Sequence, residues 1–211
     1  ENKQTKFGVE IQHPEITVLK AIHEVSPVVI SKEELQAELD TLLDHRVVTL
    51  RHPSQSAIFK VAATVEKYIR EFLTAQDFTQ INSPKIIAFP TEGGSEVFEV
   101  KYFDRICYLA QSPQFYKQMM VGVFERVYEI GPVFRAEPSA TTRHMTEYTS
   151  VDCELGFITF DELMNFTGSL LRHVVESTWK SHEFAFKMWN VPKALIPEKD
   201  EDIPRITIDE I

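Results

Sequence analysis

Cysteine is scarce in this sequence, and no apolar run is long enough to cross a membrane. Only Cys107 and Cys153 occur, without a Cys-x-x-Cys pair, so neither a disulfide framework nor a zinc site is expected. A membrane-spanning helix needs about 20 largely apolar residues, and a secretion signal needs a basic and then an apolar segment at the N-terminus. The sequence shows neither pattern, which favours a cytoplasmic protein without a membrane partner.

Positive charge is also in short supply. Lys and Arg number 22 against 32 Asp and Glu, which gives a net charge of −10. Because phosphate groups are bound mainly by Lys and Arg, composition alone speaks against a nucleic-acid partner. The content of 43% apolar and 26% charged residues is ordinary for a globular protein with a hydrophobic core. A length of 211 residues allows one large domain, or one domain and the remnant of another.

Hydrophobic spacing and capping signals predict helices in four places. A helix at residues 31–43 would start from a capping box of Ser31 and Glu34, and another would start from Thr159 and Glu162 and reach residue 179 or beyond. Between residues 58 and 73 apolar side chains recur every three or four positions, which indicates an amphipathic helix. Pro113 is expected at the first position of a helix that ends near residue 125.

Short apolar segments between these helices predict strands. They lie at residues 16–19, 28–30, 78–81, 97–100, 105–109, 127–136 and 148–158. The segments 97–100 and 105–109 read as a hairpin, and the last two strands are joined by a polar loop. Together these elements predict a mixed α+β fold, an antiparallel sheet flanked by helices.

Two carboxylates stand side by side in the last predicted strand. Alternation puts Asp152 and Glu154 on one face and Cys153 on the other. Such carboxylates repel each other unless a cation lies between them, and an ammonium group or a metal ion would serve. The simpler interpretation, which the residues alone favour, is a solvent-exposed polar face.

Cationic side chains gather around the end of the preceding strand. Arg135 and Glu137 are two residues apart, and Arg143 and His144 follow in the connecting loop. An arginine at a strand end is suited to bidentate capture of a phosphate or a carboxylate, although an ordinary surface pair of Arg135 with Glu137 is the plainer reading.

The helix at Pro113 offers a further candidate anion site. Gln114 and Lys117 are three residues apart and share a face near its N-terminus. A helix N-terminus with a lysine attracts anions, but a lysine on a solvated face is commoner.

Read in order, these segments resemble the class II aspartyl-tRNA synthetases, particularly the archaeal and eukaryotic cytosolic type. The likeness extends from about residue 43 to residue 157. LDHRVVTLR is similar to the family's hinge, and IFKVAATVEKYIREFLTAQDFTQINSPKI is similar to motif 1, which ends in Pro84. TEGGSEVF resembles the loop that closes over bound aspartate, and YLAQSPQFYKQ resembles the amino-acid-binding segment. VYEIGPVFRAEPSATTRHMTEYTSVDCELGF resembles motif 2 with its loop.

The resemblance implies a site for L-aspartate. Lys117 would neutralise the side-chain carboxylate of the substrate, with Gln114 and Ser112 alongside. Asp152 and Glu92 would bind its ammonium group, supported by Glu154, and Arg135 would hold the reacting carboxylate.

The resemblance also implies ATP with Mg²⁺. Arg135 would hold the α-phosphate and act as the catalytic residue. Arg143 and His144 would reach the β- and γ-phosphates, and Tyr148 would stack on adenine. Glu147 lies beside that ring, and Glu137 would contact the adenine amino group or the tRNA acceptor end.

The family pattern further implies a domain division and partners. Residues 1–45 would be the remnant of an anticodon-binding domain with its hinge, and residues 46–211 the N-terminal part of a class II catalytic domain. The motif 1 region would form a homodimer, and tRNA(Asp) would be the acceptor. The family's third motif, a glycine-rich segment leading to an arginine, is absent, so the sequence reads as a piece of a longer chain that would be inactive alone.

Three alternatives stay open at this point. Asparaginyl-tRNA synthetases share motif 2 closely, although Lys117 suits a carboxylate better than an amide. Lysyl-tRNA synthetases rank lower, because they should present acidic residues to the substrate side chain. A non-catalytic synthetase paralogue would explain the absent third motif as a genuine feature.

Overall fold

The computed structural model describes residues 9–92, 96–138, 141, 144–193 and 203–210. The chain divides into two compact units, Glu1–Gln55 and Ser56–Ile211. Every predicted site residue falls in the second unit.

The first unit contains short helices and none of the strands expected there. Its helices are α1 (Leu39–Asp44) and α2 (Arg46–Thr49), and the Thr49 hydroxyl donates to the Leu42 carbonyl at 2.9 Å. Residues 16–19 and 28–30 are not strands, and the helix predicted at 31–43 begins only at Leu39, so the Ser31 capping box does not form. The physical reason is exposure: Leu19 is 95% exposed, and a strand without a partner strand or a packed face is unstable.

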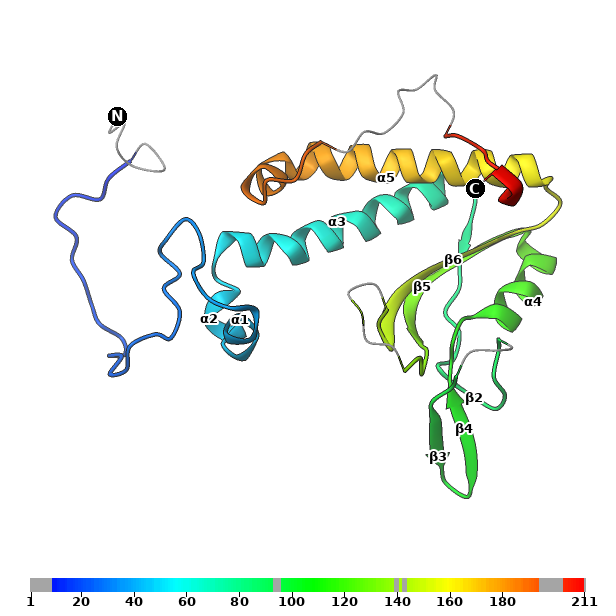
Figure 1. Ribbon diagram of the computed structural model, residues 1–211, viewed down its shortest axis with the longest axis horizontal. Helices are drawn as coiled ribbons and strands as arrows, with labels where there is room; N and C mark the ends of the chain where they lie inside the picture. Colours follow the sequence, from blue (N-terminus) through cyan, green and yellow to red (C-terminus); the bar gives the residue numbers. More distant parts are fainter. Residues whose placement is uncertain (1–8, 93–95, 139–140, 142–143, 194–202, 211) are drawn as a thin grey trace. The chain divides into compact units, whose positions relative to one another are not determined.

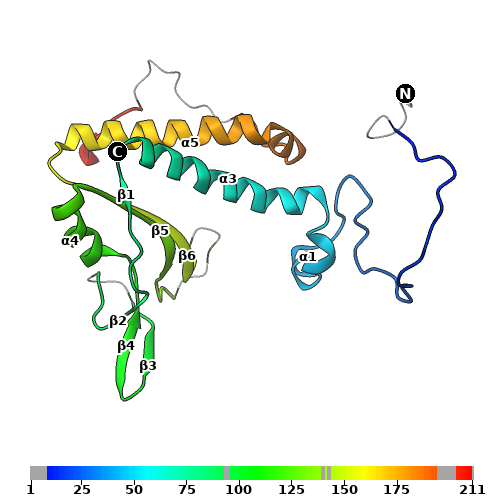
Figure 2. The same cartoon turned by 180° about the vertical axis from the view of Figure 1, so that it is seen from behind.

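Two long helices dominate the second unit and lie side by side in both views (Figures 1 and 2). Helix α3 (Pro53–Ala75) contains the predicted 58–73 helix, and α5 (Phe160–Met188) begins at the predicted capping box of Thr159 and Glu162. Tyr68 of α3 hydrogen-bonds Ser181 of α5 at 2.6 Å. Both helix predictions are therefore confirmed; α3 is longer than the predicted segment, and α5 extends beyond residue 179 as expected.

The larger sheet has the order β1-β5-β6. Strand β1 (Thr79–Gln80) runs parallel to β5 (Arg126–Phe134), which pairs antiparallel with β6 (Glu147–Leu155) from Arg126↔Leu155 to Phe134↔Glu147. The predicted strand at 127–136 thus ends at Phe134, and the one at 78–81 shrinks to two residues.

The smaller sheet has the order β2-β4-β3 and is antiparallel. Strands β3 (Glu99–Tyr102) and β4 (Arg105–Leu109) form the predicted hairpin, and β2 (Ile86–Ile87) joins the far edge of β4. Between the sheets in sequence lies α4 (Gln114–Phe124), in which Pro113 is the N-cap rather than the first helical residue. A short 3₁₀ helix, η1 (Ile208–Glu210), follows α5 in the described chain.

The hydrophobic core covers one face of the larger sheet. It joins α3, α5 and the face of β5 and β6 that carries Tyr128, Ile130 and Cys153. The residues opposite one another in an antiparallel pair project to the same side, so the register places Glu129, Asp152 and Glu154 on the other face. The α+β prediction is confirmed. One face of the larger sheet packs into the core, and the opposite face carries the charged candidate site residues.

Candidate active site

A lysine from α4 lies between the two carboxylates of β6. Lys117 Nζ donates to Asp152 Oδ1 at 3.1 Å and is 3.6 Å from Glu154 Oε2. The side chains of Lys117 and Asp152 are only 14% and 15% exposed. The Ser150 hydroxyl donates to the second Asp152 oxygen at 2.6 Å. The cation required between these carboxylates is therefore an ammonium group, and the reading of a merely solvated face is wrong.

Cys153 lies between these carboxylates in sequence but on the opposite face of β6. It packs against the core formed with α3 and α5. Burial, and next the negative charge of Asp152, raise the pKa of its thiol to about 11, against a smaller lowering effect of Lys117. A thiol in this setting stays protonated at neutral pH and is a packing residue.

Arg135 occupies the end of β5 and is held by an acidic residue from a different segment. Its guanidinium Nη2 is 3.3 Å from Glu92 Oε2, and its Cζ lies 5.9 Å from the centre of the Tyr148 ring. Arg135 Nε is a buried donor without a hydrogen-bond partner among the described residues. About a third of the side chain is exposed, at 34%. These contacts therefore hold the Arg135 side chain in place, and its Nε still has a hydrogen atom to donate.

The segment that carries Glu92 is tied to the start of α4. The Glu92 amide donates to Gln111 Oε1 at 3.2 Å, and the Thr91 hydroxyl donates to the Ser112 carbonyl at 3.4 Å. Gln111 is fully buried and Ser112 is 5% exposed. Ser112 Oγ is buried without a hydrogen-bond partner in the described structure. Glu92, Ser112, Lys117, Arg135, Asp152 and Glu154 thus belong to one connected region.

The other predicted site residues lie around its edge. Gln114 begins α4 and is half-buried, as is Glu137, which lies beyond the end of β5. Glu147 is exposed at the start of β6. His144 is exposed, and its Nδ1 hydrogen-bonds the Thr141 hydroxyl at 2.7 Å. Arg143 lies outside the described residues.

Comparison with protein families shows which known proteins this chain resembles. A family model described as tRNA synthetases class II (D, K and N) matches residues 38–211, most of the chain. The chain belongs to this family. The class II resemblance of the sequence is therefore confirmed.

Curated relatives of this class II synthetase are aspartate ligases. It is 45% identical to the aspartate–tRNA(Asp/Asn) ligase of Thermus thermophilus, over 98% of this chain and 49% of that protein. It is 40% identical to the aspartate–tRNA(Asp) ligase of Pyrococcus abyssi, over 98% of this chain and 47% of that protein. The chain spans about half the length of the curated relatives it matches.

Solved class II structures share the fold. The asparaginyl-tRNA synthetase of Pyrococcus horikoshii, complexed with asparaginyl-adenylate, superposes with a TM-score of 0.75 at 32% identity, over 82% of this chain and 39% of that one. A putative aspartyl-tRNA synthetase of Leishmania major superposes with a TM-score of 0.66 at 41% identity, over 75% of this chain and 30% of that one.

The structure adds residues to the candidate site that the sequence analysis does not single out. Gln111 supports Glu92, as described above. Glu129, in the middle of β5, is 4% exposed and accepts hydrogen bonds from Lys85 and Ser83. A charged residue inside the apolar strand VYEI was a usable signal for Glu129. Its partners, 44 and 46 residues away, could not be found from spacing.

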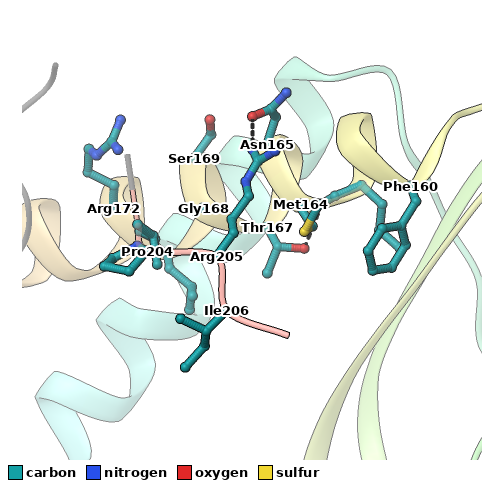
Figure 3. Close-up of a pocket in the computed structure, with 13 residues that line it drawn as sticks. Phe160, Met164, Asn165, Thr167, Gly168, Ser169, Arg172, Pro204, Arg205 and Ile206 are labelled. Atoms are coloured by element: carbon teal, nitrogen blue, oxygen red, sulfur yellow. Dashed lines mark hydrogen bonds between the residues drawn. The ribbon is translucent and has the colours of Figure 1, made fainter. Parts of the chain in front are cut away.

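A separate hollow of about 680 Å³ lies along α5, where the segment 203–206 runs beside the helix (Figure 3). Arg205 crosses it, and its Nη1 is 3.2 Å from Asp161 Oδ1 while Nη2 donates to the Asn165 side chain. The residues predicted for substrate binding do not line this hollow.

Proposed function

We propose that this chain forms the amino-acid- and ATP-facing part of an aspartate–tRNA ligase, which activates L-aspartate with ATP and transfers it to tRNA(Asp). The observation that carries the proposal is the partly buried Lys117 ammonium, held between Asp152 and Glu154 on the face of the larger sheet opposite the core. The identity with aspartate ligases over nearly the whole chain supports it.

The charges around Lys117 suit an amino acid with an acidic side chain. An ammonium group has three N–H donors, and Lys117 gives one hydrogen bond to Asp152 at 3.1 Å. A further donor can meet the side-chain carboxylate of aspartate, with Gln114 and Ser112 nearby. Asp152 and Glu154 together exceed the charge of Lys117 by one negative unit, which favours the substrate ammonium group. Glu92, which pairs with Arg135, would also bind that ammonium group.

Arg135 is suited to the phosphate that reacts. Its Nη2 pairs with Glu92, while its Nε has no partner among the described residues and a third of the side chain is exposed, so donors remain that would bind an α-phosphate and the reacting carboxylate. The carboxylate oxygen would attack the α-phosphorus in line, the bond to pyrophosphate would break, and Arg135 would stabilise the charge of the transition state. Tyr148, whose ring centre lies 5.9 Å from Arg135 Cζ, would stack on adenine.

The remaining ATP contacts are assigned by resemblance. Glu137 and Glu147 would lie near adenine, and His144 with Arg143 would reach the outer phosphates. Among the described residues no group of three or more His, Cys, Asp or Glu side chains could hold a metal ion. Mg²⁺ would arrive with the triphosphate.

The wider assembly is also a proposal. Residues 1–45 would belong with an anticodon-binding domain and hinge, and residues 46–211 with the catalytic domain. The motif 1 region, residues 58–84, would form a homodimer. The described helices include none that is long and apolar enough to cross a membrane. The two free cysteines support a cytoplasmic location.

An asparagine ligase is the second candidate, because the Pyrococcus horikoshii asparaginyl-tRNA synthetase shares the fold at a TM-score of 0.75. Lys117 favours aspartate over asparagine, since an ammonium group complements a carboxylate better than an amide.

ATP–pyrophosphate exchange by the full-length gene product tests the proposal. Exchange should depend on L-aspartate, with asparagine and lysine giving background rates. Exchange driven by asparagine instead, or no exchange with any of the three, would refute it.

A further inference from the structure

Glu129 is a nearly buried carboxylate directly beside the proposed aspartate site. It is 4% exposed in the middle of β5, and its register partner on β6 is Asp152. Directly opposite residues in an antiparallel pair share one face, with Cβ atoms about 5 Å apart. Two carboxylates in that relation repel each other, so each needs its own cation.

Each carboxylate has such a cation, and each comes from a different segment. Lys85 Nζ donates to Glu129 Oε1 at 2.6 Å, while Lys117 donates to Asp152 at 3.1 Å. The second oxygen of Glu129 accepts from the Ser83 hydroxyl at 2.7 Å and the Ser83 amide at 3.2 Å. Lys85 also donates to Ser83 Oγ at 3.2 Å. Lys85, Glu129 and Ser83 thus hydrogen-bond to one another in a closed network.

The backbone leaves room for this arrangement. Gly131 follows Glu129 on the same face of β5, and a Cβ there would come within 3.2 Å of Glu129 Oε1. The same Cβ would be 3.7 Å from Lys85 Cε. The Ala110 amide donates to the Lys85 carbonyl at 3.0 Å, next to the Gln111–Ser112 segment of the site. Lys85 is therefore anchored through both its main chain and its side chain.

We propose that Lys85 is a positioning residue of the aspartate site, because it neutralises Glu129 and so keeps Lys117 on Asp152. Without Lys85 the Glu129 carboxylate, opposite Asp152 on the neighbouring strand, would compete with Asp152 for the ammonium group of Lys117. Lys117 would then be withdrawn from the substrate's side-chain carboxylate. This inference rests on the proposed function and adds the residues that tune it.

The test is a charge-balance cycle in the full-length gene product, read by aspartate-dependent ATP–pyrophosphate exchange. Lys85→Met should raise the KM for aspartate about tenfold or more, while the KM for ATP stays within about threefold. Lys85→Arg keeps the charge and should retain most of the affinity for aspartate. Glu129→Gln alone should also raise the aspartate KM, because Lys85 would then compete for Asp152.

The double variant K85M/E129Q separates positioning from mere packing. It removes both charges, so the aspartate KM should return to within about threefold of the wild-type value. A double variant that still has an aspartate KM tenfold above the wild-type value overturns the proposal. Single variants with an unchanged KM for aspartate would also overturn the proposal. If a single variant fails to fold in a thermal melt, the comparison of the double variant with wild type still decides.

The matched control is Lys187→Met on α5, which removes another short Lys–Glu pair. Lys187 Nζ lies 2.7 Å from Glu183 Oε1, and the Lys187 side chain is 72% exposed. It should leave both KM values unchanged. Wild-type protein that gives no aspartate-dependent exchange would instead contradict the proposed function, so the two failures can be told apart.

Discussion

At the scale of single residues, Lys117 is the group on which the proposed recognition of aspartate depends. Lys117→Met removes the ammonium that faces Asp152 and Glu154 and leaves two partly buried carboxylates unbalanced. We expect kcat/KM for aspartate to fall about a hundredfold or more, while the KM for ATP stays within about threefold. Steady-state exchange kinetics on the full-length protein measure both. Lys180→Met, an exposed lysine of α5, is the control; equal losses for aspartate and ATP would count against the assignment.

Cys153 gives a prediction that needs no activity. Its thiol pKa is raised from 9.0 to about 11, first by burial and then by Asp152. The stability from keeping this thiol neutral is complete below pH 9.0 and is lost as the pH rises through about 11. Alkylation by iodoacetamide in a Cys107→Ser background should be slow at pH 8 and still rise above pH 10, because the thiolate is the reactive form. A rate that levels off below pH 9 would contradict the raised pKa.

At the scale of elements, the start of α5 depends on a cap visible in the sequence. The Thr159 hydroxyl accepts from the Glu162 amide at 3.3 Å, and the Glu162 carboxylate accepts from the Thr159 amide at 2.6 Å. Thr159→Ala should lower stability by about 1 kcal/mol, which calorimetry would register as roughly 2–4 °C in Tm. Thr167→Ala, later in the same helix, is the control, and an unchanged Tm for T159A would contradict the cap.

The same cap has a pH dependence. The backbone and then the side chain of Thr159 lower the pKa of Glu162 below its usual value. The cap is therefore fully formed above the usual pKa of a glutamate and is lost as the pH falls through the lowered value. The Tm difference between wild type and T159A should shrink in that acidic range.

Elements with a strong local signal were the ones that sequence could predict. The three-and-four spacing of α3 and the capping box of α5 are complete within one segment, so both predictions are confirmed. The segments 16–19 and 28–30 have strand-like composition, but a strand also needs a neighbour, which composition does not reveal. Alternation within one strand was enough to place Asp152 and Glu154 on the same face. The pairing of Glu129 with Lys85 depends on tertiary packing, which the local sequence does not reveal.

At the scale of the whole molecule, the net charge does not reveal where individual positive groups lie. The total of −10 speaks against a nucleic-acid partner. The face of the larger sheet opposite the core nevertheless receives Lys85 and Lys117 from flanking segments, with Arg135 at the end of β5. Each cation is held by a carboxylate, so an acidic chain can place fixed positive groups where an anionic substrate would bind.

The two units should also differ in resistance to protease. Lys20 lies outside helices and strands, whereas Lys60 lies within α3, and both side chains are exposed. Trypsin needs an extended backbone, so side-chain exposure alone does not make a site cleavable. Brief digestion of this chain, followed by mass spectrometry, should show cleavage after Lys20 well before cleavage after Lys60. Comparable rates at the two lysines would mean that α3 opens as readily as the first unit, because both side chains are exposed while only Lys60 lies in a helix.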